Sequence, residues 1–483
     1  MPDTLMVGVS GVRGIVGRDL TPELVARYGA AFGVWAATER GAGSGRRARA
    51  AVVLARDART SGPMFVAAAT AGLLSVGCDV IDAGLVPTPT AQLAVEHHRA
   101  AGGVILTASH NPIEWNALKF VGPDGIFLGP DAAARVSALA GDARLPRADA
   151  MGVGVVRVDG DALERHLDAL LDLPAVDVRR IRRRRFRVAL DTVRGAGGPA
   201  MTELLRRLGC RVAGINLETD GRFPRAPEPV PENLRQLAAL VRRSRADVGL
   251  AVDPDVDRLA VVDERGRPIG EDYTVAFAVR AVLGGGRWEG GKVGRGKGRK
   301  GHSNLPTFQP SPVVCSLSTS LVVEDAARDC GAAVVRTPVG EAHVARRMIA
   351  LGARIGGEGN GGVMYPALHV GRDAPVGAAL LLTLLARDGR AVSELVDAAP
   401  RYVIVKAKTP RGAALEAVYA GLRAHFPDAA ADTQDGLRLA WSDRWLHVRP
   451  SNTEPIIRFI AEARTREEAE TLIAEGRRLC AAS

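Results

Sequence analysis

The chain has 483 residues, which is more than one hydrophobic core organises, so we expect three or four domains. Hydrophobic residues make up 47% of it, and the longest apolar run, residues 376–386, is too short for a membrane span of about 20 residues. The N-terminus lacks a signal-peptide pattern, and the five cysteines are scattered without metal-ligand spacing. We therefore expect a cytoplasmic protein that neither crosses a membrane nor depends on disulfides.

The formal net charge of +10 is concentrated in two segments. Residues 179–187 contain seven arginines and no acidic residue, and residues 287–300 contain six basic residues and one acidic residue. Neither segment forms a known docking motif, so we interpret the arginine run as a solvated surface and do not expect a nucleic-acid partner. Residues 284–312 are rich in Gly, Lys, Arg and Pro, which predicts a disordered or extended loop.

Short β-branched runs alternate with Ala- and Leu-rich helical patterns along the chain. The order strand, turn, helix, strand occurs three times, which predicts three similar α/β domains. A smaller α+β domain is expected to follow, because the last part of the chain combines two helices with a few strands. The expected domains cover residues 1–150, 151–255, 256–390 (with a basic insertion at 284–312) and 391–483. The strand–helix–strand units are 51–54, 62–76, 79–82; 186–190, 198–208, 211–215; and 312–315, 320–330, 332–335, and the last domain has strands at 401–407, 437–441, 445–448 and helices at 412–425 and 466–480.

The stretch from Thr107 to Pro112 follows the apolar run 103–106. A strand that ends in small and polar residues and is stopped by proline would present the hydroxyl of Ser109 at a tight turn, which is the setting of an exposed nucleophile. His110 and Lys119 add an imidazole and an ammonium group nearby, a combination suited to carrying or receiving a phosphoryl group. The alternative is a turn whose polar side chains only make local hydrogen bonds.

Three carboxylates, Asp253, Asp255 and Asp257, alternate in a loop between the strand-like runs 248–252 and 259–262. They would repel each other unless a cation lies among them, and hard oxygen ligands favour Mg²⁺. A calcium EF-hand does not fit, because Arg258 occupies the sixth position, where glycine is needed. A solvated acidic turn is the remaining alternative.

Two further loops gather polar groups in turns. The glycine-rich stretch 356–362 carries Glu358 and Asn360, which suit vicinal hydroxyls or an amine, although a plain flexible connector fits equally well. The turn that begins at Arg449 suits an oxyanion such as phosphate, and a surface turn with an ion pair to Glu454 is the alternative. The groups of this turn are Arg449, Ser451, Asn452, Thr453 and Arg458.

In their order along nearly the whole chain, these motifs resemble those of the α-D-phosphohexomutase family, and they are most similar to phosphoglucosamine mutases of archaeal type. The matching motifs are SGVRG at 10–14, RDARTSG at 56–62, TASHNP at 107–112, DPDVDR at 253–258, GGEGNGG at 356–362 and RPSNTEP at 449–455.

The resemblance implies a fold and a reaction. Four domains would surround a central cleft, and hexose 6-phosphate and hexose 1-phosphate would interconvert through a phosphoserine at Ser109 and a bisphosphate intermediate. Mg²⁺ would be the cofactor and hexose 1,6-bisphosphate the activator. The implied residue roles are metal binding by Ser109, Asp253, Asp255 and Asp257; contact with the transferring group by Arg13, His110, Lys119 and Arg258; sugar binding by Glu358 and Asn360; and phosphate binding by Arg449, Ser451, Asn452, Thr453 and Arg458.

The resemblance leaves more than one candidate sugar. Glucosamine phosphate is the favoured substrate, because SGVRG, GGEGNGG and RPSNTEP are most similar to the motifs of phosphoglucosamine mutases. Glucose or mannose phosphate is the alternative, because family members with another form of the loop at 356–362 have Ser and His where this chain has Asn360 and Gly362. A phosphosugar- or nucleic-acid-binding protein without catalysis is a hypothesis of another class. The chain is expected to act as a monomer or homodimer on a small phosphosugar.

Overall fold

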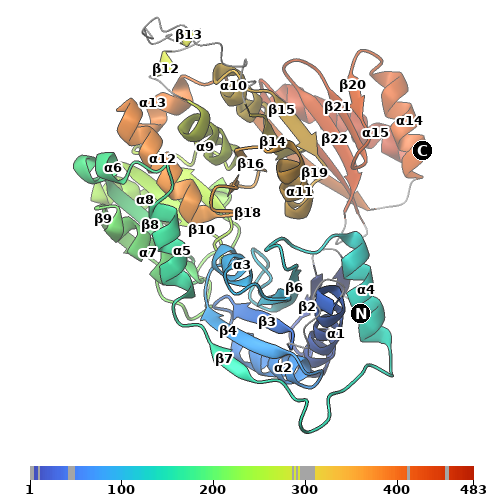
Figure 1. Cartoon of the computed structure of the whole chain (residues 1–483). Coiled ribbons are helices and arrows are strands. Elements are labelled where there is room, and N and C mark those ends of the chain that lie inside the picture. The colour runs from blue at the N-terminus through green and yellow to red at the C-terminus, as the bar shows by residue number, and fades with distance from the viewer. Residues whose placement is uncertain are drawn as a thin grey trace, which may run out of the picture.

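The computed structural model describes residues 5–8, 11–41, 49–284, 288–289, 292–293, 311–410, 414–451 and 456–482. Most of the loop expected at 284–312 lies outside these residues, apart from two short paired strands, β12 (Trp288–Glu289) and β13 (Lys292–Val293). The described chain forms four successive units, each built around its own sheet (Figure 1). Three are similar α/β units and the last is a smaller α+β unit, as the sequence predicts.

The first unit contains a seven-stranded sheet in the order β1-β2-β6-β5-β3-β4-β7. Two of its helices, α1 and α2, pack unusually close, because a Cβ on Gly72 of α2 would lie 2.1 Å from the carbonyl oxygen of Ala26 in α1. The elements are β1 (Met6–Gly8), β2 (Gly11–Ile15), α1 (Pro22–Gly41), β3 (Ala51–Arg56), α2 (Gly62–Leu74), β4 (Asp79–Leu85), α3 (Thr88–His97), β5 (Gly102–Leu106), β6 (Trp115–Val121), α4 (Pro130–Gly141) and β7 (Val156–Val158).

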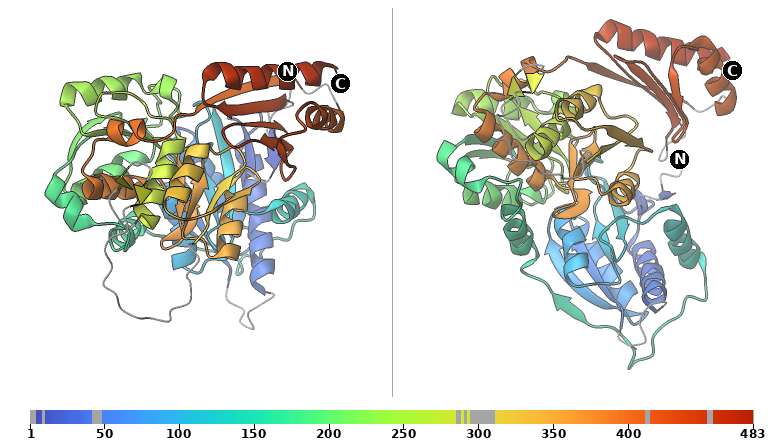
Figure 2. Two further views of the ribbon diagram at one scale, coloured as in Figure 1. Left: turned by 90° about the horizontal axis from the view of Figure 1, so that it is seen from above. Right: turned by 45° about the horizontal axis from the view of Figure 1, so that its top comes forward.

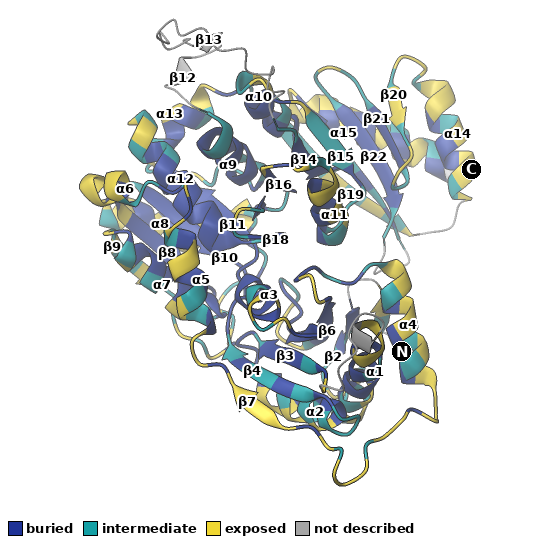
Figure 3. Ribbon diagram, viewed as in Figure 1, coloured by how far each residue is buried: buried dark blue, intermediate teal, exposed yellow. Residues whose placement is uncertain are grey.

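The second unit has a four-stranded sheet in the order β11-β10-β8-β9. Because β11 pairs with β10, this sheet continues to Val262, past the boundary expected at residue 255. The arginine run forms α6, whose arginines are exposed while Ile181 is buried, in agreement with the predicted solvated surface (Figure 3). The elements are α5 (Ala162–Leu171), α6 (Val178–Arg184), β8 (Arg187–Asp191), α7 (Gly197–Arg207), β9 (Arg211–Ile215), the 3₁₀ turn η1 (Pro231–Asn233), α8 (Arg235–Ser244), β10 (Val248–Val252) and β11 (Leu259–Val262).

The third and fourth units each have a five-stranded sheet, in the orders β15-β14-β16-β17-β18 and β19-β23-β22-β21-β20. The fourth sheet is antiparallel throughout, and α14 and α15 pack on it (Figure 2). The third unit consists of α9 (Asp272–Leu283), β14 (Val313–Ser316), α10 (Leu321–Asp329), β15 (Val334–Thr337), α11 (Glu341–Leu351), β16 (Ile355–Glu358), β17 (Gly362–Tyr365), β18 (His369–Arg372), α12 (Ala374–Asp388) and α13 (Val392–Asp397). The fourth consists of β19 (Val403–Pro410), α14 (Leu415–His425), β20 (Ala430–Asp432), β21 (Leu437–Ala440), β22 (Trp445–Pro450), β23 (Ile456–Ala463) and α15 (Arg466–Ala482).

The three α/β units share one strand arrangement. In each, a parallel strand–helix–strand unit is extended on its other side by a third parallel strand, which then pairs with an antiparallel strand. The third parallel strands are β5, β10 and β16, so the loops that follow them are structurally equivalent. These loops hold Ser109, the three aspartates and Asn360, which means that three of the sequence motifs occupy the same position in three copies of one topology.

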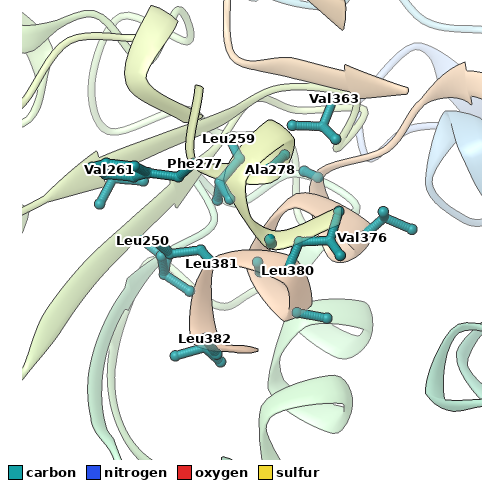
Figure 4. Packing of buried hydrophobic residues seen from close by; sticks show 14 of the residues in the cluster. Leu250, Leu259, Val261, Phe277, Ala278, Val363, Val376, Leu380, Leu381 and Leu382 are labelled. Atoms are coloured by element: carbon teal, nitrogen blue, oxygen red, sulfur yellow. The ribbon is translucent and has the colours of Figure 1, made fainter. Parts of the chain in front are cut away.

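A single hydrophobic cluster joins the second and third units. Helix α12 contains the apolar run 376–386, and its Leu380 and Leu381 pack with Leu250 and Phe277 from the neighbouring elements (Figure 4). The run is apolar on all sides because protein surrounds it. In the described part of the chain, every helix is too short or too polar to be a membrane span.

Candidate functional site

Ser109 lies in the turn after β5, in the left-handed region with φ of +48°. Its N–H donates to the hydroxyl of Thr107 at 2.9 Å, which in turn donates to Asp57 at 2.7 Å. The tight turn forms as expected, but the predicted exposure is wrong: Ser109 is only 4% exposed. The aspartate loop of the second unit covers it, and the Ser109 hydroxyl donates to Oδ2 of Asp253 at 2.8 Å.

A fully buried arginine, Arg59, fixes the shape of this turn. Its guanidinium pairs with Asp57 at 3.2 Å and lies over the ring of Phe223. In the sequence Arg59 stood out only as part of the RDARTSG motif at 56–62, and its role was missed because its backbone acceptors lie about fifty residues further along the chain. The four acceptors are the backbone carbonyls of Ser109, Asn111, Pro112 and Trp115, at 2.7, 2.7, 2.7 and 2.8 Å.

The three aspartates offer one carboxylate oxygen each within 4.8 Å of one another, and all three side chains are buried. The alternative of a solvated acidic turn is therefore wrong. The loop is buried because it lies between β10 and β11 and contacts the first unit: Asp255 accepts from Lys119 at 2.7 Å and from Thr88 at 3.0 Å.

This cluster fits a divalent cation. Oδ1 of Asp255 and Oδ1 of Asp257 are buried and accept no hydrogen bond. Burial and the neighbouring carboxylates raise the pKa of Asp253. For Asp255 burial acts in the same direction, but the ion pair with Lys119 and the hydrogen bonds to the carboxylate together outweigh it and lower the pKa. Three converging carboxylates, two of which have an oxygen that accepts no hydrogen bond, are the kind of ligands that Mg²⁺ prefers.

Further cationic and titratable groups surround Ser109. Arg13 on β2 donates to the side chain of Asn111 at 2.6 Å, and burial lowers the pKa of Arg13 to about 10. Nδ1 of His110 lies 3.4 Å from the Ser109 hydroxyl, and the charge of Arg258 together with burial holds the pKa of His110 well below its usual range. The imidazole is therefore neutral at neutral pH. Arg258 itself lies 3.8 and 4.0 Å from the carboxylates of Asp257 and Asp253.

The sugar-loop candidates lie next to the aspartate loop, and a second missed arginine joins them. Glu358, at the end of β16, is buried and accepts from Arg372 at 2.9 Å, and Arg372 also contacts Asp257 at 2.5 Å and Glu341 at 3.0 Å. Asn360 is partly exposed, and its side chain accepts from the backbone of the same turn. The sequence signal for Arg372 was an Arg-Asp pair separated by two residues from the longest apolar run.

Two of the phosphate-loop candidates, Arg449 and Arg458, lie on the fourth sheet. Arg449 on β22 is the cross-strand partner of Arg458 on β23, which is in turn the partner of Lys408 on β19. Directly opposite residues project from the same face of a sheet, where like charges are unfavourable unless an anion offsets them. Ser451 begins the loop, and its N–H donates to the carbonyl of Ile456 at 2.9 Å. Asn452 and Thr453 lie outside the described residues.

Comparison with known proteins agrees with this geometry. Four family models match in order: phosphoglucomutase/phosphomannomutase α/β/α domain I at residues 4–145, domain II at 164–266, domain III at 299–402 and the C-terminal domain at 402–479. A phosphoglucomutase/phosphomannomutase of Thermococcus kodakarensis is 38% identical over 98% of both chains, and a probable phosphoglucosamine mutase of Methanopyrus kandleri is 36% identical over 96% of this chain and 95% of its own.

Among solved structures, a phosphoglucomutase/phosphomannomutase family protein of Burkholderia thailandensis superposes with a TM-score of 0.81, at 26% identity and with 99% of this chain and 97% of that chain covered. The models, the relatives and the shared fold agree over almost the entire length. The chain therefore belongs to the phosphoglucomutase/phosphomannomutase family and is a phosphohexomutase.

Proposed function

We propose that the chain interconverts hexose 6-phosphates and hexose 1-phosphates through a phosphoserine at Ser109, with a hexose 1,6-bisphosphate as the intermediate and activator. The observation that carries this proposal is the 2.8 Å contact between the hydroxyl of Ser109, in the first unit, and the buried aspartate cluster of the second unit. A serine with only a structural role would not need three buried carboxylates beside it.

Asp253, Asp255 and Asp257 would hold Mg²⁺ together with an oxygen of the phosphorylated Ser109. When bound, the ion would offset negative charge on the transferring phosphoryl group. The unused oxygens of Asp255 and Asp257 support this assignment, because a buried carboxylate oxygen without a partner is costly.

The chain's own cations then act on the phosphoryl group. A phosphoserine carries a charge of about −1.5 to −2, and Lys119, Arg13 and Arg258 surround the position that it would occupy. As a sugar hydroxyl forms its bond to phosphorus, the bond from phosphorus to the serine oxygen breaks, and in the net reaction the proton of the sugar hydroxyl ends on the serine oxygen. The positioned cations stabilise the charge on the phosphoryl oxygens. Depending on its tautomer, neutral His110 can donate a hydrogen bond to the serine oxygen or accept one from the serine hydroxyl.

The bisphosphate would turn over between the two transfers, so the phosphate that is not reacting needs a second site. The row of Lys408, Arg458 and Arg449 on the fourth sheet supports such a site, because the three cations lie on neighbouring strands. We propose that Ser451, Asn452 and Thr453 complete it, and that Glu358 and Asn360 contact the sugar.

We propose glucosamine phosphate as the preferred substrate, with glucose and mannose phosphates as the alternative. The sequence of the sugar loop and the phosphoglucosamine mutase relative support the first, and the phosphoglucomutase/phosphomannomutase relative supports the second. We further propose a cytoplasmic enzyme, which the five free cysteines support.

Two measurements test the proposal. Intact-mass and peptide mapping should find one adduct of about 80 Da on Ser109 after incubation with glucose 1,6-bisphosphate. Turnover of glucosamine, glucose and mannose 6-phosphates, with Mg²⁺ and the matching bisphosphate, should rank glucosamine first, and Ser109→Ala should abolish it. Normal turnover by Ser109→Ala would place the nucleophile elsewhere, and a faster rate on glucose or mannose would select the alternative substrate.

A further inference from the structure

Asp435 lies in the turn between β20 and β21, where the fourth unit meets the third. Its Oδ2 forms an ion pair with Nε of Arg449 at 2.9 Å, without the alignment of a hydrogen bond, and accepts a hydrogen bond from the backbone N–H of Val339 at 3.1 Å. The side chain of Asp435 is 15% exposed and that of Arg449 is 8% exposed, so the pair is largely shielded from solvent. One carboxylate oxygen therefore contacts both the phosphate loop of the fourth unit and the segment that precedes α11 in the third.

The turn that carries Asp435 is itself held in place. Nε2 of the buried His447 lies 2.6 Å from the carbonyl oxygen of Asp435, and its Nδ1 lies 2.8 Å from the hydroxyl of Ser318. Because a carbonyl only accepts, Nε2 carries the proton and Nδ1 accepts from the serine. Gly436 has φ of +74°, and a Cβ there would lie 2.4 Å from the carbonyl oxygen of Val448, so the turn packs directly on the backbone beside Arg449.

The contacts continue from Val339 to the sugar loop. The next amide along the chain, that of Gly340, donates to Oε1 of Glu358 at 2.9 Å. Two successive amides thus bind carboxylates from two units, and Gly340 permits this with a φ of +133°, which residues with a Cβ rarely adopt. Arg372 holds the other oxygen of Glu358 at 2.9 Å.

We propose that Asp435 is a positioning residue that couples the phosphate loop to the sugar loop. This inference rests on the proposed function, in which Arg449 binds the non-reacting phosphate and Glu358 contacts the sugar. The negative charge of Asp435 beside Nε keeps the guanidinium in place, so that its planar fork can bind phosphate through the terminal nitrogens. The placement of Arg449 and the placement of Glu358 then depend on each other through the Val339–Gly340 backbone.

The test compares Asp435→Asn with Asp443→Asn. The first substitution keeps the shape of the side chain and an acceptor for Val339 but removes the charge, and the second makes the same charge change on a 43% exposed side chain of the same unit. Titration calorimetry with glucosamine 6-phosphate and glucose 6-phosphate measures affinity without requiring turnover. We expect Asp435→Asn to bind about tenfold more weakly than wild type, or about 1.4 kcal/mol, and Asp443→Asn to bind like wild type.

A double-substitution cycle with Glu358→Gln then tests the coupling. If the two sites are coupled, the fold-loss of affinity in the double variant is smaller than the product of the two single fold-losses, by a factor of about three or more. Circular dichroism at the titration temperature verifies folding, and Asp435→Ser replaces Asp435→Asn if the latter is unfolded.

Each result decides between the hypotheses. Equal affinities for Asp435→Asn and Asp443→Asn would overturn the positioning role, and losses that multiply would overturn the coupling. A wild-type chain that binds the sugar phosphates without turning them over would contradict the proposed function while leaving the comparison at Asp435 valid. A wild-type chain that binds neither compound would overturn both.

Discussion

Replacement of Arg59 by methionine should destabilise the turn that carries Ser109. Methionine keeps an unbranched apolar stem but cannot donate hydrogen bonds, so four backbone carbonyls lose a charged donor and Asp57 loses its buried counter-ion. Removing one partner of a buried ion pair costs about 3–5 kcal/mol, a large part of the 5–15 kcal/mol that typically stabilises a folded protein. Arg59→Lys keeps the charge but loses the planar fork, and we expect a smaller loss of about 1–3 kcal/mol.

Urea unfolding gives the loss of stability, and hydrogen–deuterium exchange of the peptide covering residues 107–115 shows where it occurs. Arg206→Met is a matched control, because Arg206 has a 70% exposed side chain and pairs with Glu203 on the surface. Burial raises the pKa of Asp57 even against the opposing charge of Arg59, so without Arg59 this carboxyl should take up a proton more readily. The destabilisation by Arg59→Met should therefore be smaller at acidic pH than at neutral pH. Unchanged exchange in residues 107–115, with stability equal to that of Arg206→Met, would refute the reasoning.

Three further changes probe the site and the fold. Asp257→Ala should weaken Mg²⁺ binding at least about tenfold, because it removes one of three converging carboxylates. The Mg²⁺ concentration needed to raise the melting temperature measures this loss, and an unchanged concentration would exclude Asp257 as a ligand. Arg372→Met leaves Asp257, Glu341 and Glu358 without their shared cation, and it should lower the free energy of unfolding in urea by about 3–5 kcal/mol. A decrease smaller than that of a surface substitution would contradict the bridging role. Burial lowers the pKa of His447 from 6.5 to about 4, so between these pH values the unfolded chain binds a proton that the folded chain does not bind. The free energy of unfolding should therefore fall by up to about 3 kcal/mol as the pH drops from 6.5 to 4. His447→Gln should flatten this pH dependence, and a pH profile identical to that of the wild type would contradict the assignment to His447.

The repeated strand–helix–strand order was readable because hydrophobic periodicity is local, and the parallel pairs β3–β4, β8–β9 and β14–β15 form where it predicts them. The motifs around Ser109 and Asp253 were readable for the same reason, since the residues of each lie next to one another in the chain. The boundary expected at residue 255 fell inside a hairpin, because pairing of β10 with β11 depends on hydrogen bonds that composition does not reveal.

The sequence by itself determined the class of the fold and the residues of each loop, because strand and turn patterns and the chemistry of a motif are short-range properties. The tertiary structure alone decided which loops meet. The burial of Ser109 beneath Asp253 depends on a residue 144 positions away, and the three carboxylates at Arg372 come from separate segments. Such contacts follow from how the units pack, and the spacing of residues along a chain carries no record of that packing.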